Sequence, residues 1–82
     1  MLTKAQHSRF YKEIPLLLRQ MREEAGLTQR ELADRVKKIQ SWVHTSEAGI
    51  RRIDMAEFTL WARACDADPV KAYRRLVKRI GE

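Results

Sequence analysis

The apolar residues of the chain recur at the spacing of amphipathic helices. In the first third of the sequence they stand three, four and seven positions apart, at Phe10, Ile14, Leu17, Leu18, Met21 and Ala25. We expect this helix to begin near Lys4, where Thr3 and Gln6 have the spacing of a capping box. Gly26 is expected to end it as a left-handed cap. Because Pro15 lacks an N–H group, the helix is expected to bend or restart there.

Two shorter helices are expected next. Thr28 stands three residues before Glu31, the spacing of a capping box, and this predicts a helix over residues 29–35. Its inward positions are Leu32, Ala33 and Val36. After two lysines, a third helix is expected over roughly residues 40–48, where Gly49 stops it.

The last third of the chain predicts two more helices. Asp54 and Glu57 have capping-box spacing, and Asp68 followed by Pro69 is typical of a helix start. The inward residues of the fourth helix are expected to be Phe58, Trp61, Ala62 and Cys65, and those of the fifth Val70, Tyr73, Val77 and Ile80. Since no segment alternates with period two, the chain is expected to be an all-α domain of five helices.

Size and composition are those of one small packed domain. The 82 residues are 44% apolar and include only three Gly and two Pro, so residues 1–82 are expected to fold as a single unit. The lone Cys65 cannot close an intramolecular disulfide, and no apolar run approaches the roughly 20 residues that span a bilayer. We therefore expect a cytoplasmic protein without a membrane segment.

The charge of the chain favours a polyanionic partner. Seventeen Lys and Arg residues against eleven Asp and Glu residues give a net charge of +6, which favours nucleic acid. Two short helices joined by about four residues form the geometry that places a helix in the DNA major groove. The outer face of the second helix of this pair is polar but not acidic, with Gln40, Ser41, His44 and Thr45. Such side chains donate to and accept from base edges.

The chain resembles a known family in four segments that follow one another in the same order. They are residues 22–36, 40–43, 47–49 and 51–54. Over about residues 16–68 the chain resembles the phage-repressor and Cro class of helix-turn-helix regulators, the XRE-like family. The resemblance implies a compact five-helix, repressor-like DNA-binding domain whose second and third helices form the motif. Residues 1–15 are then expected to be an N-terminal helical extension, and residues 69–80 a basic C-terminal helix.

The resemblance also implies roles for individual residues. Base reading is expected from Gln40, Ser41, His44 and Thr45. Phosphate contacts are expected from residues at or beside helix ends, namely Gln29, Lys38, Arg51 and Arg52. Arg22 and Glu47 are expected to form a structural ion pair between the first helix and the end of the third. For Trp42 two roles stay open: packing against a sugar-phosphate strand, or filling the core beside Ser46.

Four positions depart from the family pattern; one is Thr45, which takes a position that is often basic or amide-bearing. Lys37 stands where the turn usually has Gly, so a left-handed backbone there would cost about 1 kcal/mol, and a different turn is the alternative. Ile39 replaces the usual Ser, Thr or Pro, which weakens the cap of the third helix. Ser46 takes a position that is normally large and apolar. The base preference of other family members is therefore not transferred to this chain.

No other chemistry is indicated. His7, His44 and Cys65 lack the spacing of metal ligands, and the pair Glu23-Glu24 is expected to be solvated surface. Neither a cofactor, a metal nor an enzymatic activity is expected. Five basic residues form one face of the last helix, and three partners stay possible for this face: a lipid surface, DNA, or water alone. They are Lys71, Arg74, Arg75, Lys78 and Arg79.

The function expected from the sequence is sequence-specific binding of double-stranded DNA. We expect a bacterial or phage transcriptional regulator, most simply a repressor that occupies its operator as a homodimer, paired through the fifth helix or the end of the fourth. The alternative is an antitoxin-like interaction module, whose main partner is a toxin protein and which also binds its own promoter. The basic fifth helix with its Tyr73 is compatible with such a partner.

Overall fold

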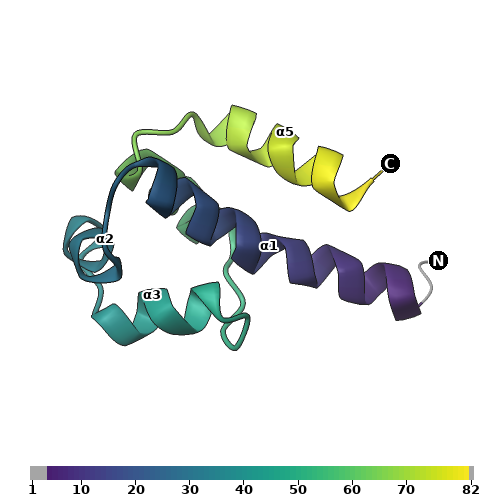
Figure 1. Ribbon diagram of the computed structural model, residues 1–82, viewed down its shortest axis with the longest axis horizontal. Helices are drawn as coiled ribbons and strands as arrows, with labels where there is room; N and C mark the ends of the chain where they lie inside the picture. Colours follow the sequence, from purple (N-terminus) through teal and green to yellow (C-terminus); the bar gives the residue numbers. More distant parts are fainter. Residues whose placement is uncertain (1–3, 82) are drawn as a thin grey trace.

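Five helices account for most of the chain that the computed structural model describes, which comprises the backbone of residues 4–81 and the side chains of residues 8–81 (Figure 1). They are α1 (Lys4–Glu24), α2 (Gln29–Val36), α3 (Gln40–Glu47), α4 (Met55–Ala64) and α5 (Pro69–Ile80). The all-α prediction is confirmed; α2 ends one residue later than expected and α3 one residue earlier. The expected capping box of Thr3 and Gln6 involves side chains outside the described residues.

Helix α1 is the scaffold of the fold. Helices α3, α4 and α5 all pack against it, and α2 packs on α3 and α4. In Figure 1, α5 runs along one side of α1 while α2 and α3 lie on the other. Leu17, Leu18 and Met21 of α1 are buried, as the apolar spacing predicted. Among the described helices, none combines the length and the apolarity that crossing a bilayer requires.

Pro15 does not interrupt α1. The helix runs through this residue without a break, so the predicted restart is wrong. A proline removes a single N–H from the helical ladder, and packing elsewhere offsets that loss. Here the ring lies against the turn after α3, so closely that a Cβ added at Gly49 would stand 3.3 Å from the Pro15 Cγ.

Two reciprocal capping boxes begin α2 and α4, as predicted. The Glu31 N–H donates to the Thr28 hydroxyl at 3.1 Å, and the Thr28 N–H donates to the Glu31 carboxylate at 2.9 Å. Asp54 and Glu57 repeat this arrangement at 2.8 and 2.9 Å. The hydrogen bonds from Thr28 hold the pKa of Glu31 below its usual range, so the box is intact at neutral pH.

Each turn between consecutive helices contains one residue with a positive φ, at Gly26, Lys37, Gly49 and Asp66. The turn after α2 keeps the left-handed backbone even without glycine, since Lys37 has φ 58°. Its N–H donates to the Asp34 carbonyl at 3.3 Å, and the Lys38 N–H donates to the Ala33 carbonyl at 2.9 Å. This is the Schellman pattern, so the motif retains its turn and the alternative turn is not used.

Trp61 joins α4 to α1 at the centre of the core. It is fully buried, and its indole N–H donates to the Leu18 carbonyl at 3.0 Å. The other three residues predicted to face inward from α4, Phe58, Ala62 and Cys65, are buried as well. Burial raises the pKa of the Cys65 thiol to about 11, so it is an uncharged core group at neutral pH.

The inward face of α5 differs from the prediction. Ala72 and Leu76 are buried, whereas Val70 and Tyr73 are exposed and Val77 and Ile80 are only half-buried. The helix is therefore rotated relative to the face expected from its large apolar residues. A small residue at the contact allows close approach to α1. Two partly exposed ion pairs also join α5 to α1: Arg75 with Glu24 at 2.9 Å and Arg79 with Glu13 at 3.4 Å.

Lys37→Gly should raise the free energy of unfolding by about 1 kcal/mol, because glycine adopts a left-handed backbone without the steric cost of a Cβ. Chemical denaturation of the variant and the wild type measures this difference. The matched control is Lys12→Gly, an exposed site inside α1, where the same substitution should destabilise by about 1 kcal/mol. Destabilisation by both variants would contradict the turn assignment.

Candidate nucleic-acid interface

Helix α3 carries the polar face that the sequence singled out. Three residues, 37–39, separate it from α2. Its N-cap residue, Ile39, makes no side-chain capping bond, as the apolar side chain predicted. Val43 and Ser46 are buried against the core. Three side chains on the opposite face are exposed and form what we call the reading ridge: Gln40, Ser41 and His44.

Thr45, the fourth expected base reader, lies at the edge of this face. It is half-buried, and its hydroxyl donates to the Ser41 carbonyl at 2.8 Å. The hydroxyl hydrogen is therefore already used within α3, since one O–H donates one proton. Thr45 retains a methyl group and acceptor capacity, but it has no free donor in this conformation.

Trp42 links the interface to the core. Its ring packs against that of Trp61 with centroids 5.7 Å apart and planes at 39°. The cations of Lys38 and Arg51 lie over the same ring, at 5.7 and 5.0 Å from its centroid. Trp42 also lines an open hollow of about 600 Å³, here called the Trp42 groove, together with Lys37, Lys38, Ile39, Ser41, Thr45 and Arg51.

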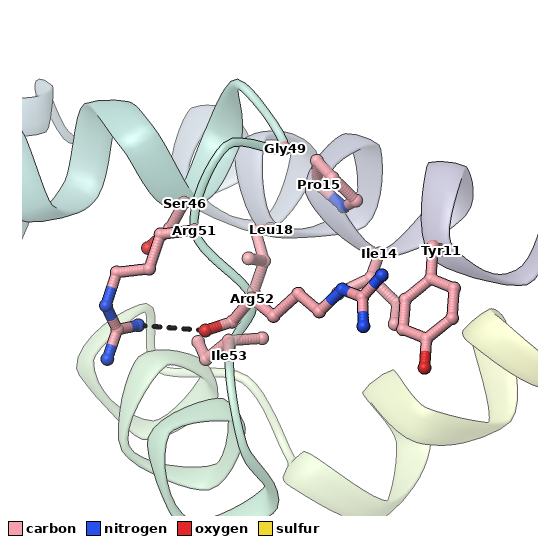
Figure 2. A pocket seen from close by; sticks show the side chains of 9 residues that line it. All are labelled: Tyr11, Ile14, Pro15, Leu18, Ser46, Gly49, Arg51, Arg52 and Ile53. Carbon is pink, nitrogen blue, oxygen red and sulfur yellow. Dashed lines mark hydrogen bonds between the residues drawn. The ribbon is translucent and has the colours of Figure 1, made fainter. Parts of the chain in front are cut away.

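Trp42 does not fill the space beside Ser46. The Ser46 hydroxyl donates to the Trp42 carbonyl at 2.7 Å, and a cavity of about 130 Å³ remains next to it (Figure 2). Residues from α1 and from the α3–α4 loop line this cavity, among them Pro15, Leu18 and Ile53. Of the two roles left open for Trp42, filling this space is not observed, because its ring packs on Trp61 at the edge of the core instead.

Arg22 and Glu47 form the ion pair that the resemblance implied. The Arg22 Nε and Nη2 donate to the two carboxylate oxygens of Glu47 at 2.7 and 3.0 Å, and the side chains are only 12% and 4% exposed. Arg22 Nη1 also donates to the Leu27 carbonyl at 2.8 Å. The hydrogen bond to Glu47 raises the pKa of Arg22 above its ordinary value, so this guanidinium stays charged at all physiological pH values.

Gln29, an expected phosphate ligand, belongs to the same network. Its side-chain nitrogen donates to the Glu47 carboxylate at 3.1 Å. An amide nitrogen has two hydrogens, so one remains for a phosphate oxygen. Glu47 thereby holds the start of α2 and the end of α3 against α1.

The two arginines of the α3–α4 loop have different environments. Arg51 is paired with Glu57 at 2.5 Å, and this pairing holds the pKa of Glu57 below its usual range. Arg52 lies over the Tyr11 ring at 3.9 Å and is exposed (Figure 2). Among the described residues, no carboxylate forms an ion pair with Arg52 or Lys38.

Sequence reasoning missed two features of this surface. The Glu57 partner of Arg51 was visible only as a capping residue, although it serves both roles. Ile39 was seen as a weak cap, whereas the structure places it in the Trp42 groove, 73% exposed. Over the described residues, no group of three His, Cys, Asp or Glu side chains is placed to hold a metal ion.

A model of the helix-turn-helix domain family matches residues 16–73, which include the whole α2–α3 unit and most of the core. This chain belongs to that helix-turn-helix family. It is an XRE-like DNA-binding regulator by family and fold. No curated protein matches it significantly.

Solved structures agree with the family assignment. An XRE-family like protein from Pseudomonas syringae pv. tomato str. DC3000 is 37% identical, with a TM-score of 0.82 and 89% of each chain covered. The restriction-modification controller protein C.AhdI from Aeromonas hydrophila is 27% identical over 76% of this chain and 90% of its own, with a TM-score of 0.69. The controller protein C.Esp1396I, on its operator, shares the fold at 20% identity and a TM-score of 0.78, covering 87% of this chain and 93% of its own.

Arg22→Met should destabilise the regulator by about 3 kcal/mol, because it leaves the Glu47 carboxylate buried without its cation. Denaturant titration monitored by tryptophan fluorescence measures the loss. The matched control is Arg19→Met on the same helix, whose pair with Glu23 is 61% and 56% exposed and should contribute less than about 1 kcal/mol. Equal effects of the two substitutions would refute a structural role for the buried pair.

Proposed function

We propose that this regulator binds a specific operator in double-stranded DNA as a two-fold dimer and represses transcription by occupying it. The observation that carries the proposal is the reading ridge. Among the described residues, the side chains of Gln40, Ser41 and His44 themselves make no hydrogen bond, although the Ser41 backbone carbonyl accepts one from Thr45. Exposed donors and acceptors on a rigidly held helix are what base recognition in the major groove requires.

Unpaired positive charge flanks the reading ridge. Lys38 lies in the turn before α3, and Arg52 lies in the loop after it. Phosphates border the major groove on both sides, so cations at the two ends of a helix inserted there are suited to hold the backbone. Arg51 shares its charge with Glu57, and we assign it a weaker phosphate contact.

The second half-site requires a second chain. One reading helix contacts too few base pairs for useful discrimination, and a two-fold dimer places two such helices about 34 Å apart. An exposed apolar stripe on α5, formed by Val70, Tyr73 and half-buried Val77, offers a surface for pairing. It continues into a hollow lined by Phe10 and Ile80. C.Esp1396I, which shares this fold, has been solved as a tetramer on its natural 35 base-pair operator.

Substitution of a residue that contacts bases should affect DNA binding differently from substitution of a residue that contacts phosphates. Gln40→Ala should remove about 1 to 3 kcal/mol of preference at one or two base pairs and leave the salt dependence of binding unchanged. Arg52→Ala should weaken binding to operator and random duplex alike, and lower the salt slope by about 1. Titrations of both duplexes at several salt concentrations measure these effects, after selection of the operator from a random pool.

The matched control for these titrations is Lys78→Ala, which removes an exposed charge from α5, across α1 from the reading ridge (Figure 1). It should leave both the preference and the salt slope unchanged. Equal weakening of both duplexes by Gln40→Ala, or no weakening of either, would exclude α3 as the reading element.

Tyr73→Asp should prevent pairing on DNA, because it places a charge in the apolar stripe of α5. Sedimentation of the operator complex should give two chains per operator for the wild type and one for the variant. Leu16→Asp is the control, since Leu16 on α1 is 48% exposed against 49% for Tyr73. A wild-type complex with one chain at saturation contradicts the dimer, and co-purification of a second protein species would favour the antitoxin alternative.

A further inference from the structure

The Trp42 groove runs beside the reading ridge and is lined differently from it. Two of its residues, Ile39 and Trp42, are apolar, and Ile39 is 73% exposed. A single exposed isoleucine needs no explanation on a protein surface. Here, however, it stands next to Gln40, the first expected base reader, and shares an open hollow with an indole ring.

Thr45 adds a third apolar group to the groove. Its hydroxyl turns back to the Ser41 carbonyl at 2.8 Å and is also 3.3 Å from the Trp42 carbonyl. The side chain then has no free donor, and it offers a ligand its methyl group and the acceptor lone pairs of its hydroxyl oxygen. The side of α3 that looked suited only to hydrogen bonding from its sequence therefore includes an apolar wall.

Cations border this wall. Lys38 and Arg51 both lie over the Trp42 ring, and Lys37 lines the same groove. A partner must therefore present an apolar group close to negative charges. On the edges of base pairs in the major groove, the apolar group is the C5-methyl of thymine, and the same methyl is present on 5-methylcytosine. Phosphates of that strand supply the negative charge.

We propose that the Trp42 groove recognises the C5-methyl group of a pyrimidine in the operator, with Ile39 as the main contact. This inference rests on the proposed function and adds a specificity-determining residue to it. Ile39 thus has a reading role at the position where the family usually has Ser, Thr or Pro, and this role accounts for its exposure without a capping bond.

The test changes single methyl groups in the selected operator. Each thymine is replaced in turn by deoxyuridine, which removes only the methyl, and each cytosine is replaced by 5-methylcytosine. Titrations should show about fourfold weaker binding for deoxyuridine at one or two positions per half-site, or about fourfold tighter binding for 5-methylcytosine, the effect expected from burying one such carbon. The first result identifies thymine as the source of the methyl, and the second identifies methylated cytosine.

Ile39→Ala should abolish this response. The matched control is Ile50→Ala, since Ile50 is 75% exposed but lies outside the groove, and it should keep the full response. Circular dichroism and thermal unfolding check that both variants fold as the wild type does. The proposal is overturned if the affinity of the wild type is the same for every methyl-altered operator. It is also overturned if Ile39→Ala keeps the full response, because the methyl effect then reflects DNA shape.

The same experiment distinguishes failure of the methyl-recognition proposal from failure of the proposed operator binding. If a palindromic consensus is selected and Gln40→Ala loses preference while methyl changes have no effect, only the groove proposal fails. If no consensus is selected from the random pool, the proposed operator binding itself fails.

Discussion

The buried contact between Arg22 and Glu47 is the constraint on which the rest of the interface depends. Two charges removed from water are tolerated only when each is fully paired, and here the guanidinium fork meets both carboxylate oxygens. Gln29 joins the same carboxylate, so α1, α2 and the end of α3 meet at one side chain. Since a partly satisfied network would be costly, this geometry favours a single orientation of α3.

Trp42 packs the middle of α3 against the core and reaches the protein surface. Its ring rests on Trp61, which is itself tied to the Leu18 carbonyl of α1. The exposed side of α3 is thus backed by two aromatic rings and a buried hydrogen bond rather than by loops. The cavity beside Ser46 shows that packing is less complete at the other end of α3. The three side chains of the reading ridge, which we propose to read bases, thus lie on a helix that is supported from the core by Trp42.

Only part of the positive charge of the chain is free of carboxylate partners. Several basic side chains that contribute to the net charge of +6 are used internally: Arg51 pairs with Glu57, and Arg75 and Arg79 hold α5 to α1. Lys38 and Arg52 keep exposed charges at the two ends of the reading ridge. Net charge alone therefore overstates how much of the surface is available to phosphates, and position relative to α3 decides it.

Local sequence signals determined the helices of this protein and the location of its motif. The capping boxes at Thr28 and Asp54 act within three residues, and periodic apolar spacing acts within a few turns, so both were readable from the chain. Tertiary structure decided what depends on distant residues. The residues that α5 buries are Ala72 and Leu76 and not its larger apolar side chains, and α1 continues through Pro15, whose ring lies against the turn after α3. The apolar wall likewise appears only where Ile39, Trp42 and Thr45 converge, because burial and mutual contact are properties of the folded chain and not of residue spacing.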